Sequence, residues 1–194
     1  KLIDWMSPRK NQHLIDVASG TGDVARAFLK ETNFSGKVSC VEPNKNMLKI
    51  GEKKLKNLAN VKWYCAQAEK LPFKDETFDI YVVSFGIRNF SNIRLALNES
   101  RRVLKTGGRF LCLEFSKVNN EILSVFYKKY SKMIPHIGKY IVGKSEPYEY
   151  LINSINDFYS QEELLKLIKS NGFESVEFRD LSGGIAAIHS GWKI

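Results

Sequence analysis

The chain has 194 residues, of which 43% are hydrophobic and 26% charged, an ordinary balance for a single globular domain with a sizeable core. No uninterrupted apolar run approaches the roughly 20 residues needed to cross a bilayer, and the start lacks a signal-peptide pattern, so we expect a cytoplasmic protein rather than a membrane-spanning or secreted one. The formal net charge of +9 is large, but the lysines are scattered along the chain, which indicates solvated helix faces and predicts no nucleic-acid partner.

Strand-like and helix-like segments alternate along the first 115 residues. The apolar spacing predicts strands at 13–18, 37–42, 61–66, 78–84 and 109–115, and helices at 23–31, 44–57 and 93–104. This order predicts an α/β fold of the Rossmann-like type, with a mostly parallel sheet and helices on both faces. In such a sheet a ligand binds where the strands end, at their carboxyl edge.

The alternation stops after residue 117. The aromatic-rich stretch 118–160 is interpreted as an insertion that covers the site. A helix at 161–170 and two strands at 175–179 and 184–190 complete a seven-stranded sheet, and Gly183 and Gly184 predict a hairpin that makes the last strand antiparallel. We expect one domain over 1–194, preceded in the native protein by further N-terminal sequence, because the chain starts without Met.

The turn after the first strand reads LIDVASGTGDVA and is the most informative local motif. Gly20 and Gly22 let the backbone turn without a Cβ, and a helix begins at Asp23, where free backbone N–H groups favour an anionic ligand. The turn therefore predicts a nucleotide-like cofactor. It does not choose one, because Gly20, Gly22 and Ala25 also satisfy the dinucleotide fingerprint, with Glu42 placed to hold a ribose.

The three cysteines, Cys40, Cys65 and Cys112, lie in strand-like apolar runs. We expect them to be reduced thiols in the core, with no disulfide among them. No group of Cys, His or acidic residues has metal-ligand spacing, so we predict no metal site.

Further sequence blocks fall at the predicted strand ends, within the stretch 118–160 and near the end of the sequence. They are AQAE with LPF at 66–73, SFGIRNF at 84–90, LKTGGRFLCLEFSKV at 104–118, PHIG at 135–138, YEYLINSINDF at 148–158 and LSGGIAAIHSGWK at 181–193. With the glycine turn and Glu42, the first and third blocks resemble class I S-adenosylmethionine-dependent methyltransferases. The whole set resembles the ubiquinone/menaquinone biosynthesis C-methyltransferase family over 14–193. Members of that family methylate a ring carbon of a polyprenylated benzoquinol or demethylmenaquinol.

The resemblance implies S-adenosylmethionine as the cofactor. It assigns cofactor contacts to Ser19, Gly20, Thr21, Gly22, Glu42, Gln67, Ala68 and Ser84. Of these, the backbone and side chain around Gln67 and Ala68 are expected to contact the adenine edge. Ser19 replaces the glycine most often found in the family, and Glu42 and Gln67 stand where Asp or Asn is common. Because a glutamate keeps the carboxylate that accepts both ribose hydroxyls, we expect binding to survive these differences.

Methylation of a ring carbon is easier on a phenolate, and holding a phenol ionised at pH 7 requires about 4 kcal/mol of preferential stabilisation. Arg88 is the first candidate for this role, and a salt bridge to a nearby acid is its alternative. Asn89 either orients the ring oxygen or caps the following helix. Glu114 is either a base that can also order a water molecule or the partner of an arginine. Tyr148 and Tyr150 suit the walls of a quinol pocket, although such aromatic residues also serve as plain core.

Several alternatives stay open at this point. The same motifs allow a class I methyltransferase for another phenolic or small-molecule substrate, or a non-catalytic scaffold in a quinone-synthesis complex. A homodimer and transient contact between the basic surface and anionic lipid at the inner membrane are further expectations. The Asn-Pro-Pro-Tyr motif of nucleic-acid amino-methylating enzymes does not follow the fourth predicted strand.

Overall fold

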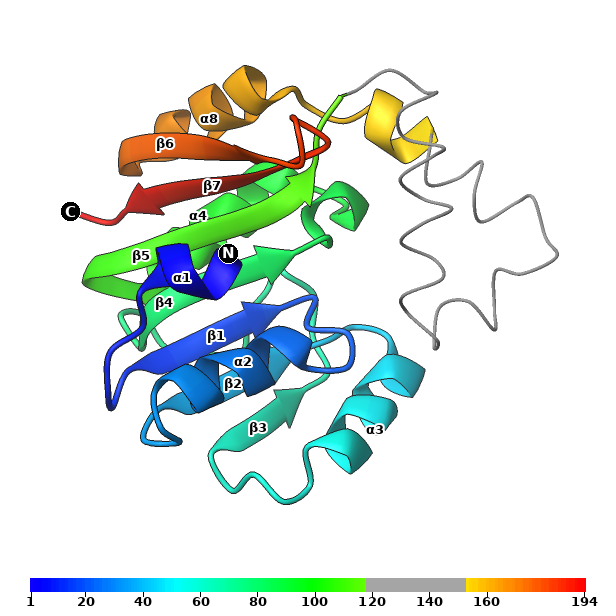
Figure 1. Ribbon diagram of the computed structural model, residues 1–194. Helices are drawn as coiled ribbons and strands as arrows, with labels where there is room; N and C mark the ends of the chain where they lie inside the picture. The colour runs from blue at the N-terminus through cyan, green and yellow to red at the C-terminus, as the bar shows by residue number, and fades with distance from the viewer. Residues whose placement is uncertain (118–152) are drawn as a thin grey trace, which may run out of the picture.

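A computed structural model describes residues 1–117 and 153–194 (Figure 1). Within these residues a seven-stranded sheet has the order β3-β2-β1-β4-β5-β7-β6. The strands are β1 His13–Val17, β2 Lys37–Val41, β3 Val61–Tyr64, β4 Phe78–Ser84, β5 Leu104–Phe115, β6 Glu174–Leu181 and β7 Ala186–Trp192. The helices are α1 Leu2–Met6, α2 Asp23–Glu31, α3 Lys45–Lys54, the 3₁₀ helix η1 Ile87–Asn89, α4 Ile93–Val103 and α8 Gln161–Ser170.

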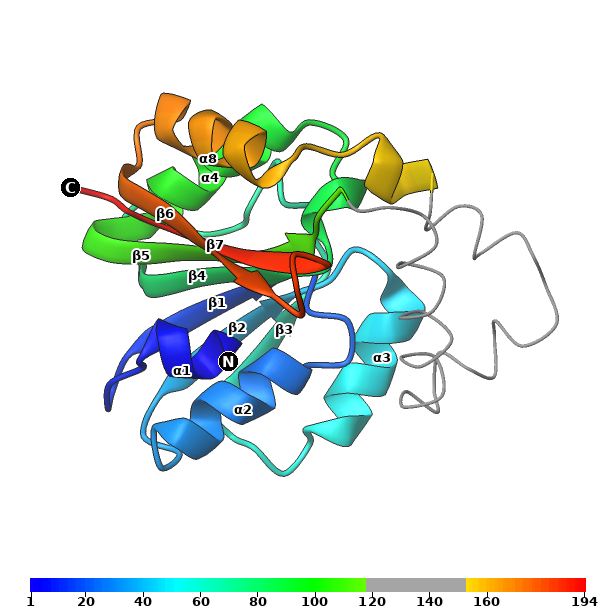
Figure 2. The same cartoon turned by 45° about the horizontal axis from the view of Figure 1, so that its top comes forward.

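Strands β1 to β5 are parallel, and β7 runs antiparallel to both β5 and β6. Helices α1, α2 and α3 cover one face of the sheet, and α4 and α8 cover the other (Figure 2). The predicted fold class is therefore confirmed, including the antiparallel last strand. The strand order reverses direction between β1 and β4, so the carboxyl ends of these two strands form the switch point at which such sheets bind ligands.

The two faces of the sheet bury separate apolar clusters because successive strand residues point to opposite sides. Ile15 and Val17 of β1 pack in the cluster that includes Ala96 and Leu97 of α4. Leu14 of the same strand points to the opposite face of the sheet and packs with Phe28 and Leu29 of α2. Burial on both faces explains why β1 and β4 are apolar along most of their length.

Helices α3, α4 and α8 each start after a residue whose side chain caps the helix. The Asn44 side chain accepts hydrogen bonds from the N–H groups of Asn46 and Met47 at the start of α3. Ser160 and Glu163 form a reciprocal capping box at the start of α8. At α4 the cap is Asn92, whose side chain accepts from Leu95 N–H at 3.1 Å. The alternative interpretation of Asn89 as this cap was wrong, because Asn89 lies within η1 and Asn92 takes the cap position.

Two other local expectations need correction. Strand β5 begins at Leu104 rather than at 109, and its pairing with β4 shifts register between Phe78 and Ile80. Cys40 and Cys112 are buried, but Cys65 is exposed because β3 ends at Tyr64 and Cys65 begins the following loop. Among the described helices, none has the length and apolar character that a bilayer crossing requires.

Candidate cofactor and methyl-transfer site

The carboxyl ends of the parallel strands bring the predicted site residues to one edge of the sheet (Figure 1). The glycine turn follows β1, Glu42 follows β2, and Gln67 and Ala68 follow β3. Ser84 ends β4, η1 with Arg88 and Asn89 comes shortly after it, and Glu114 lies near the end of β5. Tyr148 and Tyr150 lie outside the described residues.

Both glycines of the turn adopt backbone angles that other residues rarely take, with φ of 56° at Gly20 and 79° at Gly22. Gly22 also needs its small size, because a Cβ there would lie 2.6 Å from Cδ1 of Leu55. The N–H of Ser19 donates to the Val41 carbonyl at 3.1 Å, which attaches the turn to β2. The turn is thus a rigid backbone cradle at the start of α2.

Glu42 links this cradle to the second strand. Its Oε2 accepts a hydrogen bond from the N–H of Gly20 at 2.9 Å, and its Oε1 accepts from the N–H of Asn44 at 2.9 Å. A carboxylate oxygen has two lone pairs, so each oxygen keeps one for a further donor. Two adjacent ligand hydroxyls, as on a ribose, fit this remaining capacity.

Asp16 on β1 is a site residue that the sequence analysis did not single out. Its side chain is buried, and its Oδ2 has no hydrogen-bond partner among the described residues. The pKa of Asp16 is raised from its ordinary value of 3.8 to about 8, chiefly by burial, and the nearby Glu42 carboxylate contributes to the same shift. At pH 7 Asp16 is mostly protonated. The signal available in the sequence was an acid inside the apolar strand run LIDV.

Thr21 lies in an exposed polar network at the mouth of the turn. Its hydroxyl donates to Asp23 at 3.0 Å and accepts from Nζ of Lys54 at 3.1 Å. Lys54 also forms an ion pair with Asp23, at 2.8 Å. Such exposed pairs contribute little stability, so a ligand can replace these contacts at low cost.

Gln67 and Ala68 lie in the loop between β3 and β4. Gln67 is exposed, whereas Ala68 is buried. Ser84 is partly buried at the end of β4. All three residues lie beyond or at the carboxyl ends of β3 and β4, the edge at which the cofactor contacts are predicted.

Arg88 and Glu114 form a buried ion pair, with Nε 2.7 Å from Oε1 and side chains that are 5% and 2% exposed. A second contact joins Nη1 of Arg88 to Oγ of Ser154 at 2.6 Å. Burial raises the pKa of Glu114, and the Arg88 guanidinium opposes that shift. The Cζ atom of Arg88 lies over the Phe115 ring, 5.4 Å from the ring centre. The structure thus confirms that Arg88 and Glu114 pair with each other, which was the alternative expected for each of them. The pair places the permanent positive charge of Arg88 at the carboxyl edge of the sheet.

The strand order, the glycine turn on β1 and the acid after β2 define the class I methyltransferase fold. A SAM-dependent methyltransferase from Aquifex aeolicus superposes with a TM-score of 0.76 at 17% identity, over 100% of this chain and 88% of that one. The [4+2]-cyclase SpnF superposes with a TM-score of 0.75 at 18% identity, over 99% of this chain and 79% of that one. Because that neighbour is named a cyclase, the fold alone does not decide the reaction.

The sequence comparisons are more specific. Residues 1–193 match the model of the ubiE/COQ5 methyltransferase family, and the chain belongs to this family. A relative from Ruegeria sp. is 46% identical over 197 residues, covering 100% of this chain and 78% of the relative. A relative from Rickettsia akari is 48% identical over 194 residues, covering 96% of this chain and 78% of the relative. Both are named ubiquinone/menaquinone biosynthesis C-methyltransferase.

The cofactor of this class fits the residues present. Methyltransferases of this fold take their methyl group from S-adenosylmethionine. The left-handed glycines leave a backbone cradle beside α2, and Glu42 keeps acceptor capacity for two hydroxyls. The predicted family, fold class and cofactor are thereby confirmed, whereas the individual contact residues stay predictions.

Proposed function

We propose that the protein transfers the methyl group of S-adenosylmethionine to a ring carbon of a polyprenyl benzoquinol or demethylmenaquinol. The observation that carries this proposal is the family match over residues 1–193, together with relatives that are named for this reaction. The buried Arg88 and Glu114 pair supports it independently, because a phenolic substrate needs a fixed cation.

When bound, the cofactor supplies an electrophilic methyl group and a thioether leaving group. The protein must then align the acceptor carbon and make it electron-rich. We assign the second task to Arg88, whose guanidinium stabilises the phenolate form of the substrate, either in direct contact or through a water molecule. About 4 kcal/mol of such stabilisation keeps a phenol ionised at pH 7.

Glu114 has two roles in this proposal. Its carboxylate holds the guanidinium through the 2.7 Å contact to Nε. Burial also raises the pKa of Glu114, which makes its carboxylate a stronger base that can accept the phenolic proton and pass it to water. With cofactor and substrate bound, the ring carbon would take the methyl group while the thioether leaves with the electron pair of the broken C–S bond. The ring proton would then pass to water, or to Glu114 once that carboxylate has released the phenolic proton, which restores aromaticity.

The other predicted contacts complete the proposed pocket. Asn89 follows Arg88 directly in η1 and is proposed to orient a ring oxygen. Tyr148 and Tyr150 are proposed to wall the ring. The basic surface, the expected cytoplasmic location and contact with the inner membrane suit a substrate with a lipid tail. A homodimer or a quinone-synthesis complex is a further proposal.

Mass spectrometry of quinones in cells that lack this protein tests the proposed function. We expect a quinone that is one methyl group short to accumulate, and re-expression of the wild-type chain to restore the mature quinone. An unchanged quinone profile would refute the proposal. Calorimetry with S-adenosylmethionine separates the scaffold alternative, because a scaffold that has lost its cofactor site would give no binding heat.

A further inference from the structure

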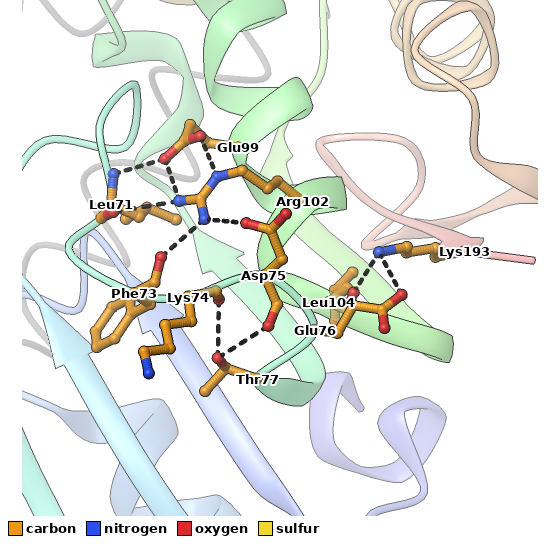
Figure 3. Close-up of polar contacts among 10 residues, drawn as sticks. All are labelled: Leu71, Phe73, Lys74, Asp75, Glu76, Thr77, Glu99, Arg102, Leu104 and Lys193. Atoms are coloured by element: carbon orange, nitrogen blue, oxygen red, sulfur yellow. Dashed lines mark hydrogen bonds and ion pairs between the residues drawn. The ribbon is translucent and has the colours of Figure 1, made fainter.

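The loop between β3 and β4, residues 65–77, contains no helix or strand, yet it carries the predicted adenine contacts Gln67 and Ala68. A loop of this length needs external contacts to keep one conformation. Among the described residues, the densest set of such contacts comes from α4, on the face of the sheet that this helix covers (Figure 3). Arg102 and Glu99 supply most of them.

Every N–H group of the Arg102 guanidinium has an acceptor. Nε and Nη2 donate to the two oxygens of Glu99 at 2.6 and 2.8 Å. Nη2 also donates to the Leu71 carbonyl at 3.2 Å, and Nη1 donates to the Phe73 carbonyl and to Asp75 Oδ1, both at 2.8 Å. Three of the five bonds therefore end on the loop (Figure 3). A planar fork with five donors can make this set of contacts, whereas a lysine cannot.

Glu99 also contacts the loop directly, by accepting a hydrogen bond from one of its backbone N–H groups. Its Oε2 accepts from the N–H of Leu71 at 2.8 Å, so Leu71 is held by both its N–H and its carbonyl. The Arg102 hydrogen bonds lower the pKa of Glu99 and keep it charged at neutral pH. The pair is only partly exposed, with side chains that are 31% and 20% accessible.

The loop is attached to α4 at a second place, nearer to the predicted adenine contacts. The N–H of Asn92, the cap of α4, donates to Oε1 of Glu69 at 3.0 Å. Beside these attachments, Ala68 and Leu71 are buried in the cluster that contains Ala96 of α4. Contacts with α4 therefore hold the loop at Glu69 and Leu71, next to Gln67 and Ala68.

We propose that Arg102 and Glu99 are positioning residues for the cofactor, which hold the loop so that Gln67 and Ala68 are preorganised for the adenine ring. This inference rests on the proposed function, because it requires that S-adenosylmethionine binds at this edge. Because the loop loses its conformational entropy when the chain folds, that loss does not reduce cofactor affinity. Neither residue touches the reacting atoms, and the effect is on cofactor binding rather than on chemistry.

The test is the steady-state kinetics and S-adenosylhomocysteine binding of Arg102→Lys and Asp75→Asn in the full chain. For Arg102→Lys we expect KM for S-adenosylmethionine and Kd for S-adenosylhomocysteine to rise about tenfold, with kcat at saturation within about twofold of wild type. For Asp75→Asn, which keeps an acceptor oxygen but removes the negative charge from one of the five hydrogen bonds, we expect a smaller rise in the same direction. Arg101→Lys is the matched control, because Arg101 contacts the Gly172 carbonyl at 2.9 Å and not the loop.

A charge-swapped double variant, Glu99→Arg with Arg102→Glu, separates the loop contact from a simple ion pair on α4. The swap keeps opposite charges at these two positions but places a carboxylate against the carbonyls of Leu71 and Phe73. We expect the double variant to have a raised KM for S-adenosylmethionine, as Arg102→Lys does. Wild-type KM in the swap, or equal binding by wild type and Arg102→Lys, would overturn the positioning role. Failure of the wild-type chain to bind S-adenosylhomocysteine would instead overturn the proposed function.

Discussion

Arg88 and Glu114 are 26 positions apart in sequence and meet as an ion pair that water hardly reaches, with Nε 2.7 Å from Oε1. The pair joins η1, after β4, to the end of β5. The carboxyl ends of β4 and β5 lie at the same edge of the sheet as those of β1 and β2, which the glycine turn and Glu42 follow (Figure 1). A permanent charge is thus held on two neighbouring strand ends, where a phenolic substrate would need it.

Replacing Arg88 with Ala tests the catalytic role. We expect kcat to fall by about two orders of magnitude or more, because the phenolate loses its fixed cation. The Kd for S-adenosylhomocysteine should stay within about twofold of wild type, since Glu42 and the glycine turn are untouched. Turnover measured with a demethylquinol and calorimetry with S-adenosylhomocysteine check the two expectations. Equal losses in both would mean that Arg88 serves cofactor binding.

The two halves of the ion pair should differ in their effect on stability. Glu114→Gln leaves a buried guanidinium that cannot lose its charge, and we expect it to cost about 3 kcal/mol of unfolding free energy. Arg88→Met leaves a buried acid that can take up a proton, so its cost should be smaller. The Arg88→Met, Glu114→Gln double variant should be more stable than Glu114→Gln alone. Urea denaturation at pH 7 gives these free energies, and a reversed order of the single variants would contradict the reasoning.

Asp16 predicts a pH dependence of stability. Its pKa is 3.8 ordinarily and about 8 in the folded protein, so the unfolded chain ionises first as the pH rises. The stability that Asp16 contributes is complete below about pH 4, falls by up to about 1.4 kcal/mol per pH unit, and is lost once the pH has passed about 8. We expect Asp16→Asn to remove this slope, so that the variant gains on wild type between pH 5 and pH 8. Parallel stability curves for the two proteins would show that Asp16 is ionised in the fold.

Gly51 in α3 tests packing against helix propensity. A Cβ at this position would lie 2.6 Å from Cζ2 of Trp63. Alanine gains up to about 1 kcal/mol in helix propensity, but overpacking costs about 1–3 kcal/mol, so we expect Gly51→Ala to lower the melting temperature. The same substitution in a Trp63→Phe background, where the ring is smaller, should be better tolerated. Calorimetry gives the melting temperatures of the wild type, Gly51→Ala, Trp63→Phe and the double variant. A higher melting temperature for Gly51→Ala than for the wild type would contradict the expected overpacking.

Glu42→Gln should weaken cofactor binding with little effect on chemistry. The amide has one acceptor oxygen, and its NH₂ group would face the N–H of Gly20 or of Asn44. We expect Kd for S-adenosylhomocysteine to rise about tenfold or more. Glu42→Asp keeps a carboxylate and is the control, with a smaller expected change. An unchanged Kd for S-adenosylhomocysteine in Glu42→Gln would show that Glu42 does not contact the cofactor.

Much of the architecture could be predicted because it depends on local pattern. The bounds expected for α2, β4 and α8 coincide with those observed, since an amphipathic period or an apolar run ends there at a clear cap or turn. Strand β5 was harder to predict, because Gly107 and Gly108 have low strand propensity and Gly107 has a φ of 78°. Backbone hydrogen bonds between these two glycines and Lys193 attach the segment to the rest of the fold.

The sequence by itself determined the alternation of strands and helices, the glycine turn with its positive φ angles, and the family, because each depends on residue order and local conformation. Only the tertiary structure decided that Arg88 meets Glu114, that Asp16 is buried with an unpartnered oxygen, and that Arg102 holds the loop after β3. The physical reason is that pairing, burial and pKa depend on neighbours contributed by distant segments. A side chain's own type and spacing do not specify those neighbours.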